Sequence, residues 1–166
     1  MADVAEVLMI EHEAIRHISR FITPSSELSL ADFHKYLKAV HIEIEEKIVF
    51  PAIEEKLPEG RKDMISTIEQ IKADHKLIDT LAGNIAKWQE KGDTDLVNER
   101  FPLYLRLLKD HNLSEDRIVF PWWKELDLRE VKSAIREAEA IIDSFGRENY
   151  IEIIGLSPES FVYMFE

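Results

Sequence analysis

Apolar residues recur at three- and four-residue steps in four long segments, which is the spacing of helices that bury one face. These segments cover residues 2–21, 30–56, 61–90 and about 101–124. No stretch alternates apolar and polar residues over the length of a strand. Since the connections between the segments are short, the pattern predicts an all-α fold, an up-down-up-down four-helix bundle.

The chain continues beyond these four segments. A fifth helix is expected to start around Asp127-x-x-Glu130 and to run to about Phe145, whereas the last twenty residues predict no definite element. We therefore divide the chain into a bundle over residues 1–125 and an additional C-terminal helix and tail over residues 126–166. This second part is expected to pack on the bundle or to mediate contacts with a partner protein or a second copy.

The second and fourth segments contain a repeated phrase, two related but not identical stretches of eleven residues. Residues 41–51 return as residues 111–121 with a constant offset of 70, and each copy carries His-x3-Glu followed by Phe-Pro. On a helix this spacing turns the two side chains about 40° apart and separates them by roughly 6 Å along the axis. Each histidine and its glutamate should therefore face the same way. The proline that ends each copy should kink or locally break its helix.

A second, shorter repeated motif supports the duplication. Glu11-His12 in the first segment resembles Asp74-His75 in the third, so each of the four helices carries one inward histidine. Buried polar groups of this kind need partners, and a metal supplies them. The candidate metal ligands are His12, His41, Glu45, His75, His111 and Glu115.

Six ligands exceed the four of a structural zinc site and suit two ions that share carboxylates. A mixed imidazole and carboxylate set favours iron, with manganese or zinc as possible substitutes. A lone histidine on an apolar face is more often a hydrogen-bonded core residue, but the symmetric set favours a metal. A bundle with bis-imidazole heme is the other reading, although it gives Glu45 and Glu115 no role.

Composition limits the other functions. The net charge of −12 argues against nucleic-acid binding and against an anionic membrane surface. The absence of cysteine excludes disulfides and thiolate metal sites. No signal peptide and no run long enough to cross a bilayer is visible, so a cytoplasmic protein is expected.

The histidine and glutamate motifs resemble those of the hemerythrin-like, or HHE cation-binding, domain family over residues 4–125. The resemblance implies a four-helix bundle that holds an oxo- or hydroxo-bridged non-heme diiron centre. Oxygen-carrying members have a second histidine four residues after the third-helix histidine, and an aspartate five residues after the fourth-helix histidine. In this chain the residue four after His75 is Asp79, and the candidate acid of the fourth helix is Glu115, four residues after His111. Four histidines and two glutamates resemble the iron-sensing and iron-repair branches more closely.

Four further residues could support the site. Asp79 could be an additional ligand or could pair with Arg16, which holds the matching place in the first half. His34 and Tyr104 each lie seven residues before the histidine of the repeated phrase, so they could line the approach to the metals or pack in the core. Glu46 is expected to point off the ligand face into solvent.

These residues favour a diiron protein that binds or reacts with dioxygen, peroxide or nitric oxide, or that senses or handles iron. The alternative is a non-enzymatic iron sensor or donor that acts through a partner protein. Reversible oxygen carriage is less favoured, and the residues do not decide whether the protein is an enzyme.

Overall fold

The computed structural model describes residues 3–56, 61–126 and 128–165, without the side chains of residues 128–132. Every regular element within these residues is helical. The first helix, α1, covers Val4–Phe21. Asp3 begins it by accepting a hydrogen bond from the backbone N–H of Ala5, while Glu6 accepts one from the backbone of Asp3. This reciprocal cap satisfies backbone donors that the first turn leaves free.

The second long helix is continuous but changes its hydrogen-bonding pattern along its length. It consists of α2 (Leu30–Tyr36), the π-helical turn η1 (Leu37–His41), α3 (Ile42–Ile44), the π-helical turn η2 (Glu45–Val49) and α4 (Phe50–Lys56). The third helix is α5, Lys62–Glu90. The fourth consists of α6 (Thr94–Ser114), the π-helical turn η3 (Glu115–Val119) and α7 (Phe120–Lys124).

A π-helical turn precedes each proline of the repeated phrase. The backbone N–H of Phe50 donates to the carbonyl of Glu45, and that of Phe120 donates to Glu115, five residues back in each case. Pro51 and Pro121 cannot donate to the usual carbonyl four residues back and would crowd it. The expected irregularity is therefore a widened turn, and the helix continues through the proline. Such turns are frequent at functional sites.

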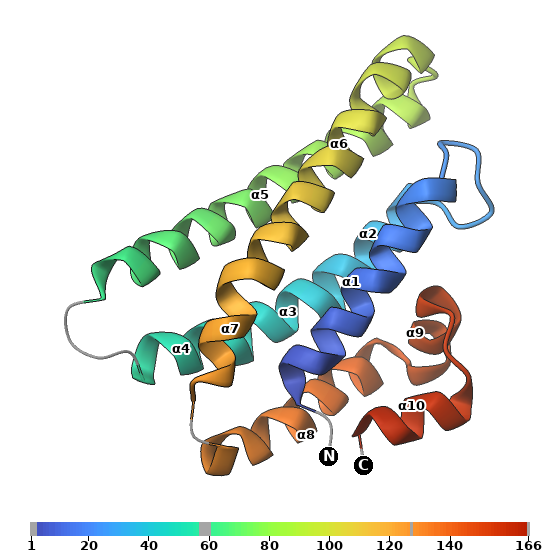
Figure 1. The fold of residues 1–166 in the computed structure, drawn as a ribbon. Coiled ribbons are helices and arrows are strands. Elements are labelled where there is room, and N and C mark those ends of the chain that lie inside the picture. The colour runs from blue at the N-terminus through green and yellow to red at the C-terminus, as the bar shows by residue number, and fades with distance from the viewer. Residues whose placement is uncertain (1–2, 57–60, 127, 166) are drawn as a thin grey trace.

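The long helices form the predicted bundle, in which α5 and α6 lie side by side as an antiparallel pair (Figure 1). The fourth helix begins at Thr94, earlier than the expected residue 101. Asp93 caps it by accepting from the backbone N–H of Leu96, and Pro102 consequently lies inside the helix. The cap at Asp93 therefore sets the start of the helix, and Pro102, which favours a start near residue 101, does not.

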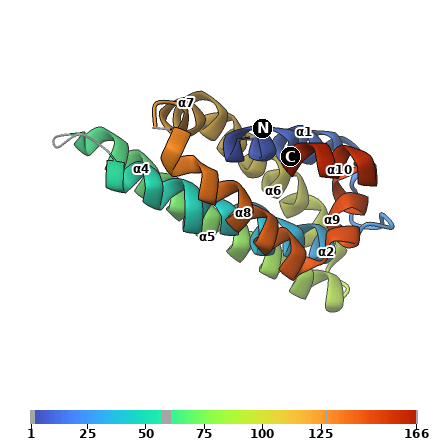
Figure 2. The same ribbon diagram turned by 90° about the horizontal axis from the view of Figure 1, so that it is seen from below.

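Three helices follow the bundle, where one helix and an undefined tail were expected. They are α8 (Leu128–Phe145), α9 (Arg147–Ile154) and α10 (Pro158–Phe165). Asp127 and the side chain of Glu130, on which the predicted start depended, lie outside the described residues. Helix α8 packs along the second long helix and α1, and α10 returns beside α8 near the N-terminus (Figure 2).

The core is apolar except at one level of the bundle. Among residues whose side chains are described, the buried polar and charged ones are Glu11, His12, His41, Glu45, His75, His111, Asn112 and Glu115. Six of these eight are the candidate ligands. None of the described helices is both long and apolar enough to cross a membrane.

Candidate metal centre

The six candidate ligands converge in the middle of the bundle. The histidines come from α1, η1, α5 and α6, while the two glutamates begin the π-helical turns η2 and η3. All six are at least 96% buried, so their polar atoms have lost their contact with water. The side chains form two groups of four, and both glutamates belong to both groups.

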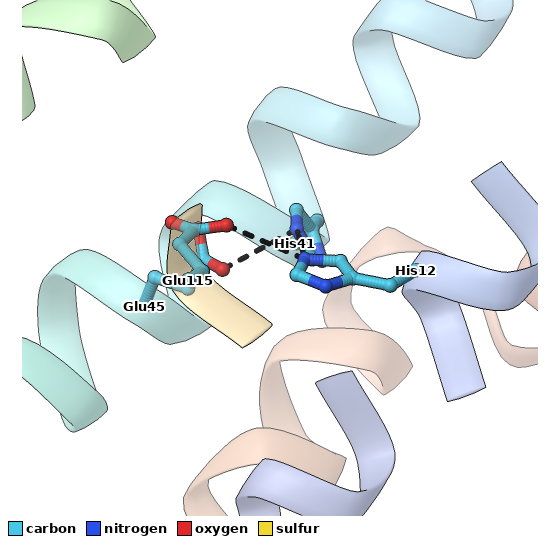
Figure 3. Close-up of side chains that lie close together, drawn as sticks. All are labelled: His12, His41, Glu45 and Glu115. Atoms are coloured by element: carbon cyan, nitrogen blue, oxygen red, sulfur yellow. Dashed lines mark hydrogen bonds and ion pairs between the residues drawn. The ribbon is translucent and has the colours of Figure 1, made fainter. Parts of the chain in front are cut away.

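The first group joins His12 and His41 to the two glutamates (Figure 3). The Nε2 atoms of the two histidines lie 3.1 Å apart. His12 Nε2 is 3.3 Å from Glu115 Oε2, and His41 Nε2 is 3.3 Å from Glu45 Oε1. One ion among these atoms would be bound by two imidazole nitrogens and two carboxylate oxygens.

The second group joins His75 and His111 to the other oxygens of the same glutamates. His75 Nε2 is 3.2 Å from Glu45 Oε2 and 3.7 Å from Glu115 Oε1. His111 Nε2 is 3.2 Å from Glu115 Oε1. Each carboxylate thus presents one oxygen to each group, which is the arrangement of a bridging ligand between two ions.

The candidate donor atoms are better satisfied by a pair of cations than by hydrogen bonds to one another. All four glutamate oxygens, and Nε2 of His75 and His111, are buried without hydrogen-bond geometry to any described residue. Buried charged oxygens without partners are costly, and two cations would satisfy all of them at once. Imidazole nitrogen and carboxylate oxygen are donors that suit iron, manganese and zinc.

Acidic side chains orient the histidines of the first group from behind. Nδ1 of His12 donates to Asp116 at 2.7 Å, and Nδ1 of His41 donates to Glu11 at 2.7 Å. Glu11 also accepts from the hydroxyl of Tyr150 on α9 at 2.7 Å. Such contacts fix the ring and direct Nε2 toward the metal position.

The second group has matching acids. Nδ1 of His75 donates to Glu46 at 2.8 Å, while Nδ1 of His111 lies 3.9 Å from Asp74. Glu46 is exposed, as expected, but its contact with a candidate ligand departs from the expectation that it points off the ligand face. It follows Glu45 at the start of a π-helical turn, which has more residues per turn and therefore a smaller angle between consecutive side chains. The Glu46 carboxylate, although 41% exposed, can then still reach Nδ1 of His75.

The duplicated sequence contained this supporting set. An acid stands directly before the first histidine of each half, and another stands directly after each ligand glutamate. Asp116 is also the residue five after His111, the place where oxygen-carrying relatives have an aspartate. In the structure its carboxylate contacts His12 and Arg16.

The buried charges strongly shift the protonation of the cluster. Burial lowers the pKa of His12, but Asp116 and the glutamates raise it to about 9. Burial is likewise outweighed at His75, where the two glutamates raise the pKa to about 11. Burial would raise the pKa of Glu115, yet the facing histidines hold it well below its ordinary value. Protons thus compete with metal for these nitrogens.

The remaining candidates form a separate group. His34 Nδ1 is 3.2 Å from the hydroxyl of Tyr104, and His34 Nε2 is 2.9 Å from Asp79. Asp79 also accepts from Lys38 at 2.9 Å, so it is neither in a ligand group nor paired with Arg16. Arg16 instead donates to Asp116 at 2.8 Å. Within the described part of the chain, neither His34 nor Tyr104 hydrogen-bonds to a candidate ligand.

Comparison with known proteins agrees with this arrangement. Residues 3–123 match the family described as the hemerythrin HHE cation binding domain. The chain therefore belongs to this family, and it contains buried histidine and glutamate groups able to hold metal ions. The comparisons with curated proteins and with solved structures gave no significant match.

Proposed function

We propose that the protein is a non-heme diiron protein that binds or reacts with a small oxidant such as dioxygen, peroxide or nitric oxide. His12 and His41 would hold one iron, and His75 and His111 the other. Glu45 and Glu115 would bridge the pair. The bound pair would supply electron transfer to the small ligand, whereas the bundle excludes water and fixes the ligands.

The observation that carries this proposal is the division of each carboxylate between the two groups. Glu45 faces His41 with Oε1 and His75 with Oε2, at 3.3 and 3.2 Å. A mononuclear site would not require this symmetry. Two imidazoles and two carboxylate oxygens per ion also leave coordination positions for a small exogenous ligand.

Two other readings fit the cluster less well. Heme would need room for a porphyrin beside the histidines, but the Nε2 atoms of His12 and His41 are 3.1 Å apart and the glutamate oxygens lie against them. Reversible oxygen carriage is disfavoured because Asp79, at the place of the carriers' extra histidine, is held by His34 and Lys38.

Iron sensing is the second candidate, and one specific contact favours it. Tyr150 of α9 donates to Glu11, and Glu11 in turn holds His41. Loss of iron would free His41 to move, and Glu11 would carry that change to the C-terminal helices. A partner protein could then recognise those helices in one state and not in the other.

The test of the metal assignment is stoichiometry. Protein purified without added metal, then reconstituted anaerobically with ferrous iron, should hold two ions per chain. Glu45→Ala should lose both ions, because each ion loses one oxygen. Glu43→Ala is the matched control, since Glu43 pairs with Lys47 outside the cluster and its loss should leave two ions. One ion per chain in the wild-type protein would exclude a diiron centre.

Hydrogen exchange separates the two candidate functions. A sensor should show markedly faster exchange in α9 and α10 after iron removal. A protein that only handles small oxidants should show its largest change around the ligands in the bundle. Equal exchange in α9 and α10 in the two states would exclude sensing through Tyr150.

A further inference from the structure

A basic pocket is lined by residues of α1 and α6. These two helices pack against each other in the bundle (Figure 2). Its volume is about 330 Å³. Four cationic side chains line it, namely Arg16, Arg20, Arg106 and Lys109. Its apolar wall is made by Ile15 and Leu105. The volume is at the lower end of the range for pockets that hold small organic molecules.

The charge of this pocket opposes that of the chain. The protein has a net charge of −12, yet no acidic residue is among those that line the pocket. Arg16 is neutralised by Glu13 and Asp116. The other three cations form no ion pair within the part of the chain that is described. Arg20 also interacts electrostatically with Glu13, at longer range than an ion pair. Positive charge gathered in a concave site attracts anions over the screening distance of roughly 8–10 Å.

A buried amide provides the second, independent observation. Asn112 lines the same pocket and is only 1% exposed. Neither its side-chain nitrogen nor its side-chain oxygen has a hydrogen-bond partner among the described residues. Leaving such a group unsatisfied is costly, whereas a ligand with an acceptor oxygen would satisfy the amide N–H.

We propose that this pocket binds a small organic anion whose carboxylate or phosphate lies among the basic side chains. The guanidinium groups of Arg20 and Arg106 and the ammonium of Lys109 would contact its charged oxygens, and the Asn112 amide would donate to one of them. Guanidinium groups suit this task because they donate two parallel hydrogen bonds to such anions. An apolar body of the ligand would pack on Ile15 and Leu105.

The pocket is distinct from the metal centre but adjacent to it. Asn112 follows the candidate ligand His111, and Arg16 reaches Asp116, which holds His12. Binding of the anion requires no metal, however, because the lining residues contain no candidate ligand. The proposal therefore stands or fails independently of the proposed diiron function.

The test is isothermal titration with three probes, namely phenyl phosphate, benzoate and inorganic phosphate. Phenyl phosphate and benzoate share a ring and differ in the anion, so the tighter of the two identifies the preferred headgroup. Inorganic phosphate should bind more weakly than phenyl phosphate because it has no apolar body. Each probe is measured on iron-loaded and on chelator-stripped protein.

Arg106→Gln should weaken binding of the preferred probe about tenfold, as expected when a charge-assisted hydrogen bond is lost. Lys62→Gln is the matched control, because Lys62 is an exposed cation at the start of α5 outside the pocket and changes the net charge equally. It should change the Kd by less than about twofold, since exposed charges act weakly at a distance. Asn112→Ala, checked for its melting temperature, should also weaken binding.

Three results would overturn the proposal. The first is the absence of binding by all three probes at millimolar concentration. The second is equal weakening by Arg106→Gln and Lys62→Gln, which would indicate only general charge. The third is binding that disappears from the chelator-stripped protein and is unaffected by Arg106→Gln, which would place the anion on the metals. Equal affinity for inorganic and phenyl phosphate would refute the organic part of the proposal.

Discussion

Replacement of Tyr150 by phenylalanine tests how the C-terminal helices are attached to the bundle. The Tyr150 hydroxyl donates to Glu11 Oε1 at 2.7 Å, and both residues are fully buried. Burial, followed by the charge of Glu11, raises the pKa of Tyr150 well above its ordinary value. The hydroxyl therefore remains a donor throughout the physiological pH range.

The magnitude of the effect follows from the charge of the acceptor. A hydrogen bond to a charged group contributes roughly 1.5–3 kcal/mol, and removing the donor leaves a buried carboxylate oxygen with one partner fewer. Tyr150→Phe keeps the ring in the core, so packing is not lost. We expect a loss of about 2 kcal/mol, which for a chain of this length lowers the Tm by about 4–8 °C.

The assay is thermal unfolding followed by circular dichroism, together with hydrogen exchange of α9 and α10. Tyr163→Phe is the matched control, because Tyr163 lies on α10 with 76% of its surface exposed. Its hydroxyl already faces water, so the Tm should move by less than about 1 °C. If the Tyr150→Phe and Tyr163→Phe variants have the same Tm, the hydrogen bond from α9 to Glu11 contributes nothing to stability and this reasoning fails.

Three further predictions concern the metal centre. Glu46→Ala should weaken iron binding about 10- to 100-fold in a chelator competition, because His75 loses its supporting hydrogen bond, whereas Glu43→Ala should leave the affinity unchanged. Equal affinities in the two variants would refute the role of Glu46. In chelator-stripped protein, the folded-state pKa values of His12 (about 9) and His75 (about 11) exceed the ordinary histidine pKa of 6.5. Protons on these histidines therefore stabilise the fold fully below pH 6.5, and this stabilisation is lost as the pH rises through 9–11. The Tm of that protein should fall from pH 7 to pH 10, and a constant or rising Tm would show that these protons do not stabilise the fold. Because Asp79 is held outside the cluster, anaerobically reduced iron protein exposed to air should not regain its reduced visible spectrum on deoxygenation; recovery of that spectrum would demonstrate reversible carriage.

The sequence predicted the parts of the molecule that obey a simple period. The bundle follows from apolar residues at three- and four-residue steps, and the convergence of six polar residues follows from repeated spacings on those helices. Both depend on local geometry that one helix dictates by itself. The repetition mattered because a single His-x3-Glu pair also occurs on exposed helix surfaces.

The supporting residues were missed because they depend on contacts between helices and on departures from the regular α period. The angles of a regular helix turn Glu46 away from the ligand face, but a π-helical turn begins at Glu45 and lets the exposed Glu46 reach His75. Glu11 was noted only as an acid before a histidine, since its partner Tyr150 lies 139 residues away. The short helices α9 and α10 carry too few turns to give a clear apolar period.

The two halves of the centre are unequal although the sequence that builds them is duplicated. Glu11 is fully buried and holds His41 at 2.7 Å, whereas its counterpart Asp74 is partly exposed and lies 3.9 Å from His111. Tyr150 of α9 covers the first half by donating to Glu11, whereas Asp74 accepts at 3.0 Å from Gln70, an exposed neighbour on its own helix α5. The His75 and His111 half is consequently less constrained and nearer to water. The C-terminal helices thus make a duplicated ligand set unequal, because within the described residues they support its first half and not its second.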